Sequence, residues 1–354
     1  MRGIAALIVL FHHFVHMFYP AVLSATGWRS ELLYPLIAGH ESVMFFFVLS
    51  GFVLALPFLR GKSQPYPVFL WRRVLRIYGP YLGALTLAIA GCAIWHNRLG
   101  STGWAAGTWG RQVDIRSVIE HIAFLGNYDY SRYDTAFWSL VYEMRISIIF
   151  PVLFIVTDRL RLRYAAILAA ACILIGVSAS DSKSLITFEY AAIFMVGILL
   201  AKNLASLSEL YRRSSASKRW LLFAVAFLLY NGGHLLTGLG PLWHLGDMPV
   251  VAGAVGFMLV GLNSSRARGV LNSTVPAFLG KISYSLYLVH GTVLFAMAAM
   301  LKDKISPLDF FVLYIPVAIL LSWGFYRAVE APFTRLSRNA ARRLVAAPVL
   351  AGKG

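Results

Sequence analysis

Long apolar runs constrain the fold of this chain more than any other feature of its sequence. A helix needs about 20 mostly apolar residues to cross the hydrocarbon core of a membrane. The runs that meet or approach this length are 3–19, 42–59, 77–95, 137–156, 164–177, 186–201, 220–236, 245–262, 282–301 and 310–329. Charged residues make up only 13% of the 354 residues, about half of their usual share in soluble domains. The sequence therefore predicts an all-α, polytopic membrane helix bundle with about ten transmembrane helices, and it excludes a soluble enzyme.

Basic residues are distributed unevenly between the loops that join these runs. Of the 32 Lys and Arg residues, 23 fall in one set of alternate loops together with both chain ends, and eight fall in the other set. Cytoplasmic loops of membrane proteins carry the excess of Lys and Arg, so we expect both termini in the cytoplasm. This topology accounts for most of the formal net charge of +17. No nucleic-acid partner is therefore expected.

The longest loop on the opposite side covers residues 96–136 and is rich in Gly, Trp and charged residues. We expect a short helix in it near residues 115–125. The loop either caps an extracytoplasmic opening or serves as a solvated connector, and the residues favour neither. Trp104, Trp109 and Trp138 suit stacking on a sugar, and they are equally typical of an aromatic belt at the membrane surface.

The first apolar run places a cation and an imidazole on one helix face. Arg2 and His13 are 11 residues apart, so they lie within about 20° of each other around a helix and about 16 Å apart along it. A neutral imidazole accepts a proton from a hydroxyl near neutral pH, which suits a general base. The alternative is a histidine that only packs against a neighbouring helix.

Metal binding has little support in this run. His12 and His16 are four residues apart, a spacing that lets two imidazoles reach one ion. No third ligand with a matching spacing follows, so we expect no metal.

Three arginines precede the third run on its cytoplasmic side. Arg72, Arg73 and Arg76 lie close together on a helix, because residues three and four apart share a face. Clustered guanidinium groups bind phosphates with fixed geometry. The cluster either receives a phosphorylated ligand or anchors the helix to anionic lipid.

The fourth run contains two opposite charges. Glu143 and Arg145 are two residues apart and point to different faces of a helix, so each needs a partner elsewhere. Glu143 either meets a basic group of the first or third run or orients His13. A purely structural ion pair is an equal alternative.

The last two runs carry further polar residues. His290 lies within the ninth run, and Arg327 and Glu330 lie three apart at the end of the tenth. We expect a local ion pair there that ends the helix before Pro332. Residues 1–335 then form one transmembrane domain, and residues 336–354 form a basic, disordered cytoplasmic tail.

Six segments in sequence order resemble the motifs of the acyltransferase-3 family of integral membrane O-acyltransferases. They are Arg2 with His13 (Arg-x10-His), FFFVLSGF at 45–52, Arg73 with Arg76 (Arg-x-x-Arg), Trp138-Ser139-Leu140 with Glu143, SYSLYLVH at 283–290, and Arg327 with Glu330-Ala331-Pro332. Three positions depart from the family pattern. Met144-Arg145 follows Glu143 where a second Glu is usual, and Gly291-Thr292 follows His290 where x-Pro is usual. Met1 directly precedes Arg2 where the family has several residues, so we expect a natural start upstream.

The resemblance implies an enzyme that transfers an acyl group, often acetyl, from cytoplasmic acyl-CoA to a hydroxyl. The acceptor is a carbohydrate, a lipid-linked glycan or another molecule of the cell envelope, and the enzyme is a multi-pass protein of the inner membrane. His13 corresponds to the family's essential His and Arg2 to its paired Arg. Arg73 and Arg76 correspond to its donor-handling motif.

We therefore expect His13, Arg2 and Glu143 to be catalytic, and Arg72, Arg73 and Arg76 to bind the acyl-CoA donor. His13 acts either as a general base or as a transient acyl carrier. The main alternative function is a proton-coupled secondary transporter or exporter, because buried His, Glu and Arg also form proton pathways. A non-catalytic organiser of polysaccharide assembly is a third class.

Overall fold

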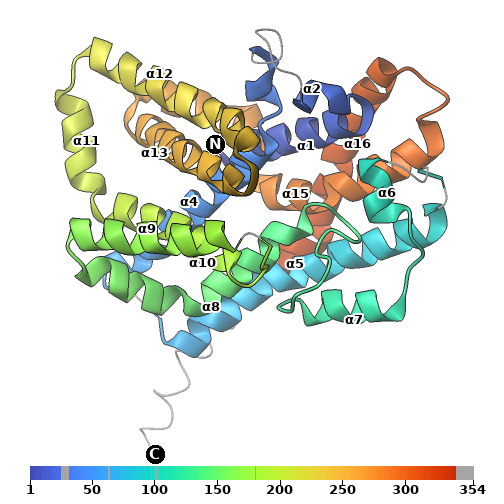
Figure 1. Ribbon diagram of the computed structural model, residues 1–354, viewed down its shortest axis with the longest axis horizontal. Helices are drawn as coiled ribbons and strands as arrows, with labels where there is room; N and C mark the ends of the chain where they lie inside the picture. Colours follow the sequence, from blue (N-terminus) through green and yellow to red (C-terminus); the bar gives the residue numbers. More distant parts are fainter. Residues whose placement is uncertain (25–31, 63, 97, 100–102, 180, 340–354) are drawn as a thin grey trace, which may run out of the picture. The chain divides into compact units, whose positions relative to one another are not determined.

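The computed structural model describes residues 1–24, 32–62, 64–96, 98–99, 103–179 and 181–339. All regular elements in these ranges are helices (Figure 1). They are α1 (Arg2–Phe18), α2 (Pro20–Ser24), η1 (Tyr34–Leu36), α4 (Gly39–Leu59), α5 (Tyr66–Trp95), α6 (Trp104–Trp109), α7 (Ile115–Ala123), α8 (Phe137–Arg159), α9 (Leu162–Ser178), α10 (Ile186–Lys202), α11 (Leu204–Arg213), α12 (Ala216–Gly232), η2 (Gly233–Gly246), α13 (Asp247–Asn263), α14 (Ser265–Leu271), α15 (Thr274–Leu301), α16 (Pro307–Phe325) and η3 (Tyr326–Glu330). The all-α prediction is confirmed.

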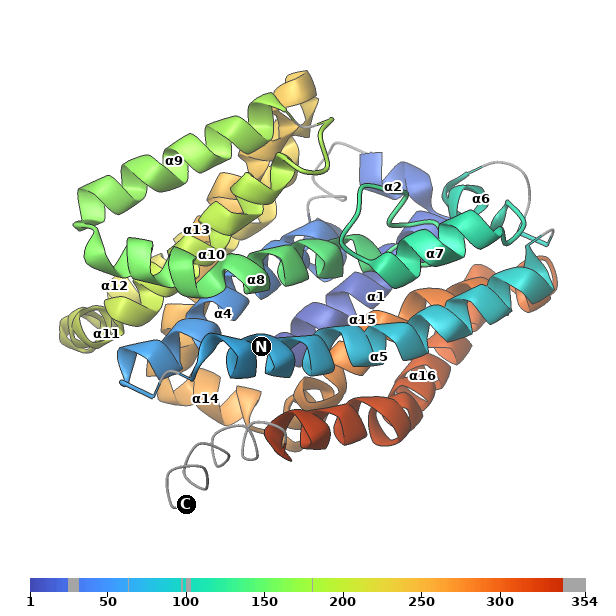
Figure 2. The same ribbon diagram turned by 90° about the horizontal axis from the view of Figure 1, so that it is seen from below.

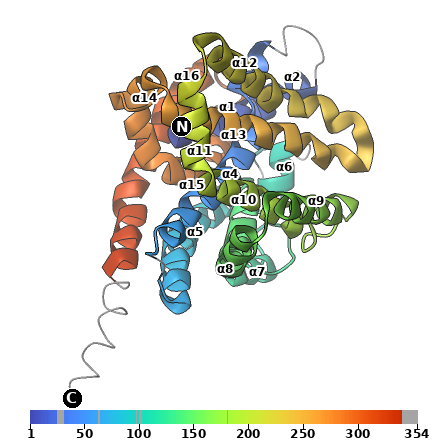
Figure 3. The same ribbon diagram turned by 90° about the vertical axis from the view of Figure 1, so that its left-hand side faces the viewer.

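The apolar runs of the sequence all fall on helices. Seven helices within the described ranges are long and apolar enough to cross a membrane. An eighth span results if α10 and α11, whose axes differ by 65° (Figure 3), count as one broken span. Two further apolar helices, α1 and α9, are shorter. The fold is thus that of a polytopic helical membrane protein. The number of ten spans and the cytoplasmic side of both termini stay predictions.

The chain divides into two compact units. The first unit comprises Met1–Val9, Glu31–Ser63 and Ile149–Lys281, and the second comprises Leu10–Ser30, Gln64–Ile148 and Ile282–Gly354. The chain therefore passes from one unit to the other within α1, α8 and α15. Each unit is built from segments that lie far apart in the sequence.

Small residues bring the helices of the first unit together. Gly51 of α4 contacts the backbone of Phe194 on α10, and Gly197 of α10 contacts the backbone of Val48 on α4. Glycine at such positions allows two backbones to approach closely, as is common in membrane bundles. α12 and α13 lie side by side (Figure 1), with Gly253 against the backbone of Tyr230.

The second unit uses α5 as its longest helix, with η3, which continues α16, packed against it (Figure 2). Gly79 of α5 makes room for the ring of Phe333, and Gly91 makes room for the ring of Trp109. On α1, the ring of Phe14 lies 4.8 Å from that of Phe311 on α16. Aromatic packing therefore joins the second half of α1 to α16.

The expectation that the last helix ends before Pro332 is wrong. The π-helical turn η3 follows α16, and helical structure continues from Ala331 to residue 339. A π turn leaves carbonyls without an i+4 donor, so it tolerates the missing N–H of Pro332. Residues 336–339 of the expected tail are thus helical, whereas residues 340–354 lie outside the described residues and the tail stays a prediction there.

The loop 96–136 is packed against its own unit. The short helix predicted near residues 115–125 is confirmed as α7, and α6 precedes it. Trp109 is fully buried and donates its indole N–H to the carbonyl of Tyr133, and buried Arg132 donates to the carbonyls of Thr108, Arg111 and Gln112. These contacts give the loop a fixed internal structure. Trp109 is thereby a structural residue and not a surface for sugar.

Candidate active site

The first functional feature of the second unit is a pair of histidines from α1 and α15. Nδ1 of His13 lies 2.7 Å from Nε2 of His290, and the two rings stack with their centroids 4.9 Å apart. His290 is fully buried. The imidazole predicted as a base is therefore held by a second imidazole, which the sequence left without a role.

The hydrogen bonds of this pair assign the tautomers. Nδ1 of His290 lies 2.9 Å from the carbonyl oxygen of Leu286, one turn earlier on α15, and a carbonyl only accepts. Nδ1 of neutral His290 therefore carries the proton, and its Nε2 accepts from Nδ1 of His13. The remaining nitrogen of His13, Nε2, is then the acceptor of the ring. This is the protonation state that a general base requires.

An indole from the loop 96–136 covers the His13 ring. The ring of Trp104 lies 5.1 Å from that of His13 and 4.8 Å from that of His16. The ring of Trp104 also packs against Phe295 on α15, with the two ring centroids 5.2 Å apart. The tryptophan therefore provides a flat apolar surface beside the His13 ring.

A buried carboxylate ties the end of the same loop to α15. Asp134 is fully buried, and it accepts from the backbone N–H of Ala136 at 2.9 Å and from the hydroxyl of Thr292 at 3.0 Å. A Cβ on Gly291 would lie 2.7 Å from an Asp134 oxygen, so glycine is needed for this approach. Gly291-Thr292, which departs from the family pattern, thus anchors Asp134 directly after His290. Burial raises the pKa of Asp134 to about 6.

The second feature is an ion pair between α5 and α8. Nη2 of Arg73 lies 2.8 Å from Oε1 of Glu143, and Nε of Arg73 donates to the hydroxyl of Ser147 at 3.0 Å. Ser139, Glu143 and Ser147 are four residues apart, so they share one face of α8. Glu143 thus meets a basic group that directly precedes the third predicted run and lies on the same helix, close to one of the alternatives derived from the sequence.

The other two arginines that the sequence predicts to bind the donor lie on the same part of α5. Nη1 of Arg72 donates to the side chain of Gln64 at 2.9 Å, whereas Arg76 is exposed. Tyr284 of α15 interacts electrostatically with Arg73 and Arg76, and its hydroxyl donates to the carbonyl of Ile77. α15 therefore has contacts with the arginine region of α5.

Helix α15 connects the two features. One turn after Tyr284, the hydroxyl of Tyr287 lies 2.7 Å from that of Ser139, and one turn further His290 meets His13. Tyr284 and His290 are six residues apart, which is about 9 Å along a helix. The Trp-Ser-Leu motif on α8 thus contacts the helix that holds the histidine pair.

Arg2 and Arg145 are two further charged residues that the sequence analysis named. Arg2 begins α1 and is exposed, and it belongs to the first unit. Arg145 donates to the carbonyls of Leu125 and Gly126 and so fastens the loop after α7. Both the catalytic role of Arg2 and that of Glu143 stay predictions.

Sequence reasoning missed three residues of this site. His290 was named without a role, and Trp104 was one of several tryptophans. Asp134 carried no signal beyond its position three residues before α8. The contacts of these residues with His13 and Thr292 each join positions more than 80 residues apart, and a local sequence pattern does not reveal such contacts.

A helical membrane fold with a largely buried imidazole pair defines an integral membrane protein with a polar site inside its helices. The acyltransferase-3 family model, described as an acyltransferase domain, matches residues 1–327. Because the match covers most of the chain, this protein belongs to the acyltransferase-3 family and is a multi-pass membrane acyltransferase. Neither the curated proteins nor the solved structures contain a match.

Proposed function

We propose that this protein transfers an acyl group from acyl-CoA to a hydroxyl of a cell-envelope carbohydrate, with His13 as the general base. The observation that carries the proposal is the bond between His13 and His290, since it leaves Nε2 of His13 as the proton acceptor. A general base requires a lone pair directed by a fixed partner on the opposite ring nitrogen.

The proposed step conserves atoms and charge. Nε2 of His13 removes the proton of the acceptor hydroxyl, and the oxygen attacks the carbonyl carbon of the thioester. The C–O bond forms, the C–S bond breaks, and the proton passes from His13 to the departing CoA thiolate. The alternative, in which Nε2 of His13 carries the acyl group, predicts an acid-labile and hydroxylamine-sensitive label on the chain when acceptor is omitted.

The donor phosphates are proposed to bind at Arg72, Arg73 and Arg76. Arg73 is fixed by Glu143 and Ser147, and a fixed guanidinium loses little conformational entropy when it binds a phosphate. Exposed Arg76 provides the most accessible charge of the three. Arg2 is proposed to guide the pantetheine arm or a phosphate from the start of α1.

A carbohydrate acceptor is supported by Trp104. Its ring lies beside His13 and is partly exposed, and aromatic rings stack on the apolar faces of sugars. The inner cell membrane is the expected location, because a donor from the cytoplasm and an envelope acceptor meet there.

The proposal is tested with the full-length protein reconstituted in lipid vesicles with radiolabelled acetyl-CoA and an envelope glycan extract. We expect release of the CoA thiol and label in the glycan, and loss of both in His13→Gln. His12→Gln is the matched control, because it makes the same substitution one residue away on α1. Mass spectrometry of envelope glycans with and without the gene identifies the acceptor by a lost acyl mass.

Two results would contradict the proposal. Transfer at the wild-type rate by correctly folded His13→Gln protein excludes the base mechanism. Solute flux without consumption of acyl-CoA supports the transporter class instead.

A further inference from the structure

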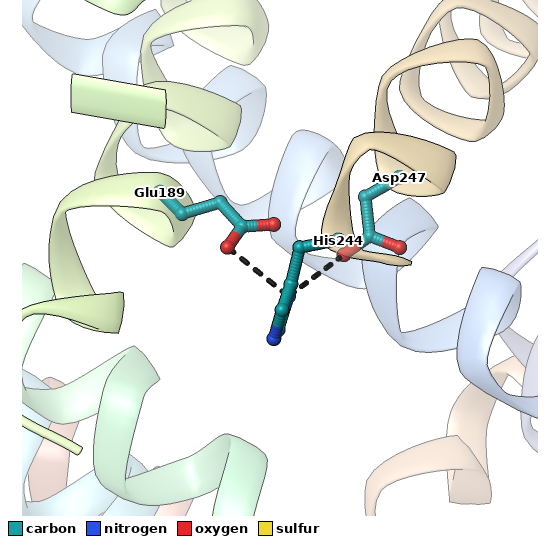
Figure 4. Close-up of side chains that lie close together, drawn as sticks. All are labelled: Glu189, His244 and Asp247. Atoms are coloured by element: carbon teal, nitrogen blue, oxygen red, sulfur yellow. Dashed lines mark ion pairs between the residues drawn. The ribbon is translucent and has the colours of Figure 1, made fainter. Parts of the chain in front are cut away.

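A second cluster of ionisable side chains lies in the first unit. Glu189 is in the first turn of α10, His244 is near the end of η2, and Asp247 begins α13 (Figure 4). Their ligand atoms all lie within 4.8 Å of one another, and this is the one such group of three among the described residues. The residues proposed for the base and for the arginine site belong to the second unit, and none of the three is among them.

The distances in the cluster match the spacing of metal ligands. Nδ1 of His244 lies 3.1 Å from a Glu189 oxygen and 3.9 Å from an Asp247 oxygen. Tetrahedral ligands about 2.0–2.1 Å from a zinc ion are roughly 3.4 Å apart, which falls between these two values. Figure 4 shows that the two carboxylates approach His244 from opposite sides.

The carboxylates of the cluster lack the hydrogen bonds that buried carboxylates normally have. Glu189 is fully buried, and neither of its oxygens makes a well-directed hydrogen bond, although Oε2 lies 3.1 Å from Nδ1 of His244; Oδ2 of Asp247, which is 2% exposed, makes no well-directed hydrogen bond either. Buried polar atoms are nearly always hydrogen-bonded. Two of these oxygens, Oε2 of Glu189 and Oδ2 of Asp247, face Nδ1 of His244, so the three side chains are arranged as the ligands of a cation.

The charges around the cluster point to a cation. Glu41, Glu189 and Asp247 are all buried, and the imidazoles of His40 and His244 contact Asp247 and Glu189, respectively. A divalent cation bound between Glu189 and Asp247 would offset the cost of burying these carboxylates close together. The N-terminal ends of α4, α10 and α13 stabilise these carboxylates, but this effect is small beside the cost of burying an unpaired charge.

A supporting hydrogen bond completes the arrangement. Nε2 of His40 lies 2.6 Å from Oδ1 of Asp247, on the oxygen opposite to the one nearest His244. In metal sites, ligating carboxylates are held in this way by a neighbouring group. Glu41 is held similarly by the hydroxyl of Tyr34 at 2.6 Å.

We propose that Glu189, His244 and Asp247 bind one divalent metal ion of the zinc class. One imidazole and two carboxylates suit Zn²⁺ or Mn²⁺, which accept nitrogen together with oxygen, better than Ca²⁺ or Mg²⁺, which prefer oxygen alone. The ion fastens the η2 segment between α12 and α13 to the start of α10. The proposal departs from the sequence-based expectation of no metal. That expectation considered ligands close together in the sequence, whereas Glu189 and His244 are 55 residues apart.

The first experiment measures metal in the full-length wild-type protein. The protein is purified in detergent, dialysed against metal-free buffer and analysed by mass spectrometry of the elements. We expect about one Zn²⁺ per chain, or saturable binding of one added Zn²⁺ after stripping with a chelator. Separate titrations with Mn²⁺, Mg²⁺ and Ca²⁺ establish the order of affinity.

The second experiment substitutes a ligand. Glu189→Gln keeps the size of the side chain and removes its charge, and we expect at least a 100-fold weaker Zn²⁺ affinity. Asp134→Asn is the matched control, because it makes the equivalent change at a fully buried carboxylate whose oxygens are hydrogen-bonded. We expect it to bind Zn²⁺ as the wild type does.

A spectroscopic measurement keeps the proposal testable if Glu189→Gln does not fold. Co²⁺ bound to the wild type should show the intense visible absorption of a tetrahedral site, and bound Mn²⁺ should show coupling to one imidazole nitrogen. The proposal is overturned if the wild type neither carries nor saturably binds a divalent metal, which would mean that the side chains share protons instead. It is equally overturned if folded Glu189→Gln binds Zn²⁺ as tightly as the wild type.

Discussion

The imidazole rings of His13 and His290 stack with Nδ1 of one 2.7 Å from Nε2 of the other, although 277 residues separate them in the sequence. This contact joins the first predicted transmembrane run to the ninth. It determines which nitrogen of His13 accepts a proton, and so it makes His290 a positioning residue for the proposed base.

Substitution of His290 tests this positioning role. His290→Phe retains a ring of similar size but removes the acceptor for Nδ1 of His13, so we expect kcat to fall by about 10²-fold. His290→Gln should retain more activity, because its amide oxygen accepts the same hydrogen bond. The KM for acyl-CoA should stay the same in both. Equal rates for Phe and Gln would show that His290 only fills space.

Charge reversal at Arg76 tests the donor site. Arg76→Glu replaces an exposed cation with an anion, so we expect the KM for acyl-CoA to rise by about 10–100-fold, the value of about one charge-assisted hydrogen bond. Arg268→Glu on α14 is the matched control, because Arg268 is also exposed and is assigned to a cytoplasmic loop. An unchanged KM in Arg76→Glu would favour an anchor to anionic lipid.

Glu143→Gln separates the two roles considered for Glu143. The side chains of Arg73 and Glu143 are 11% and 20% exposed, so we expect the loss of this partly screened pair to reduce the free energy of unfolding by about 1–3 kcal/mol. If Glu143 acts by holding Arg73, the KM for acyl-CoA rises and kcat changes little. A large fall in kcat at unchanged KM would instead assign Glu143 to the chemical step.

The buried carboxylate of Asp134 predicts a pH dependence of stability. Its pKa is about 6 in the folded protein and about 3.9 in an unfolded chain, so the folded state binds more protons between these values. The contribution of Asp134 to the free energy of unfolding should therefore fall by about 3 kcal/mol in total as pH rises from about 4 to about 6. Above pH 6 it should change little. The apparent Tm of the wild type, measured across this range, should follow that course.

Asp134→Asn should remove this part of the pH dependence, because the amide does not titrate. Asp303→Asn provides the control, since Asp303 is exposed. The same slope of Tm against pH in wild type and Asp134→Asn would contradict the assignment.

The helical membrane class was predictable because the signal is local. A run of apolar residues long enough to span the hydrocarbon core is readable without knowledge of any contact, and each of the ten runs is helical in the structure. Helix α7 was predictable from composition for the same reason. The expected helix end before Pro332 failed, because the π turn at Tyr326–Glu330 absorbs the missing hydrogen bond.

The partners of the polar residues were not predictable. The sequence required a partner for Glu143, and it left the first run, the third run and His13 as alternatives; packing of α5 against α8 selected Arg73. Trp104 was one of several tryptophans until the loop 96–136 folded over His13.

The sequence by itself therefore determined that this protein is a basic, helical membrane protein with the ordered motifs of the acyltransferase-3 family. Helix length, helix periodicity and charge bias depend on neighbouring residues, which the sequence displays directly. Only the tertiary structure decided that His290 holds His13, that Glu143 holds Arg73, and that Glu189, His244 and Asp247 meet. Such pairings depend on which helix faces pack together, and residues tens to hundreds of positions apart become neighbours only through that packing.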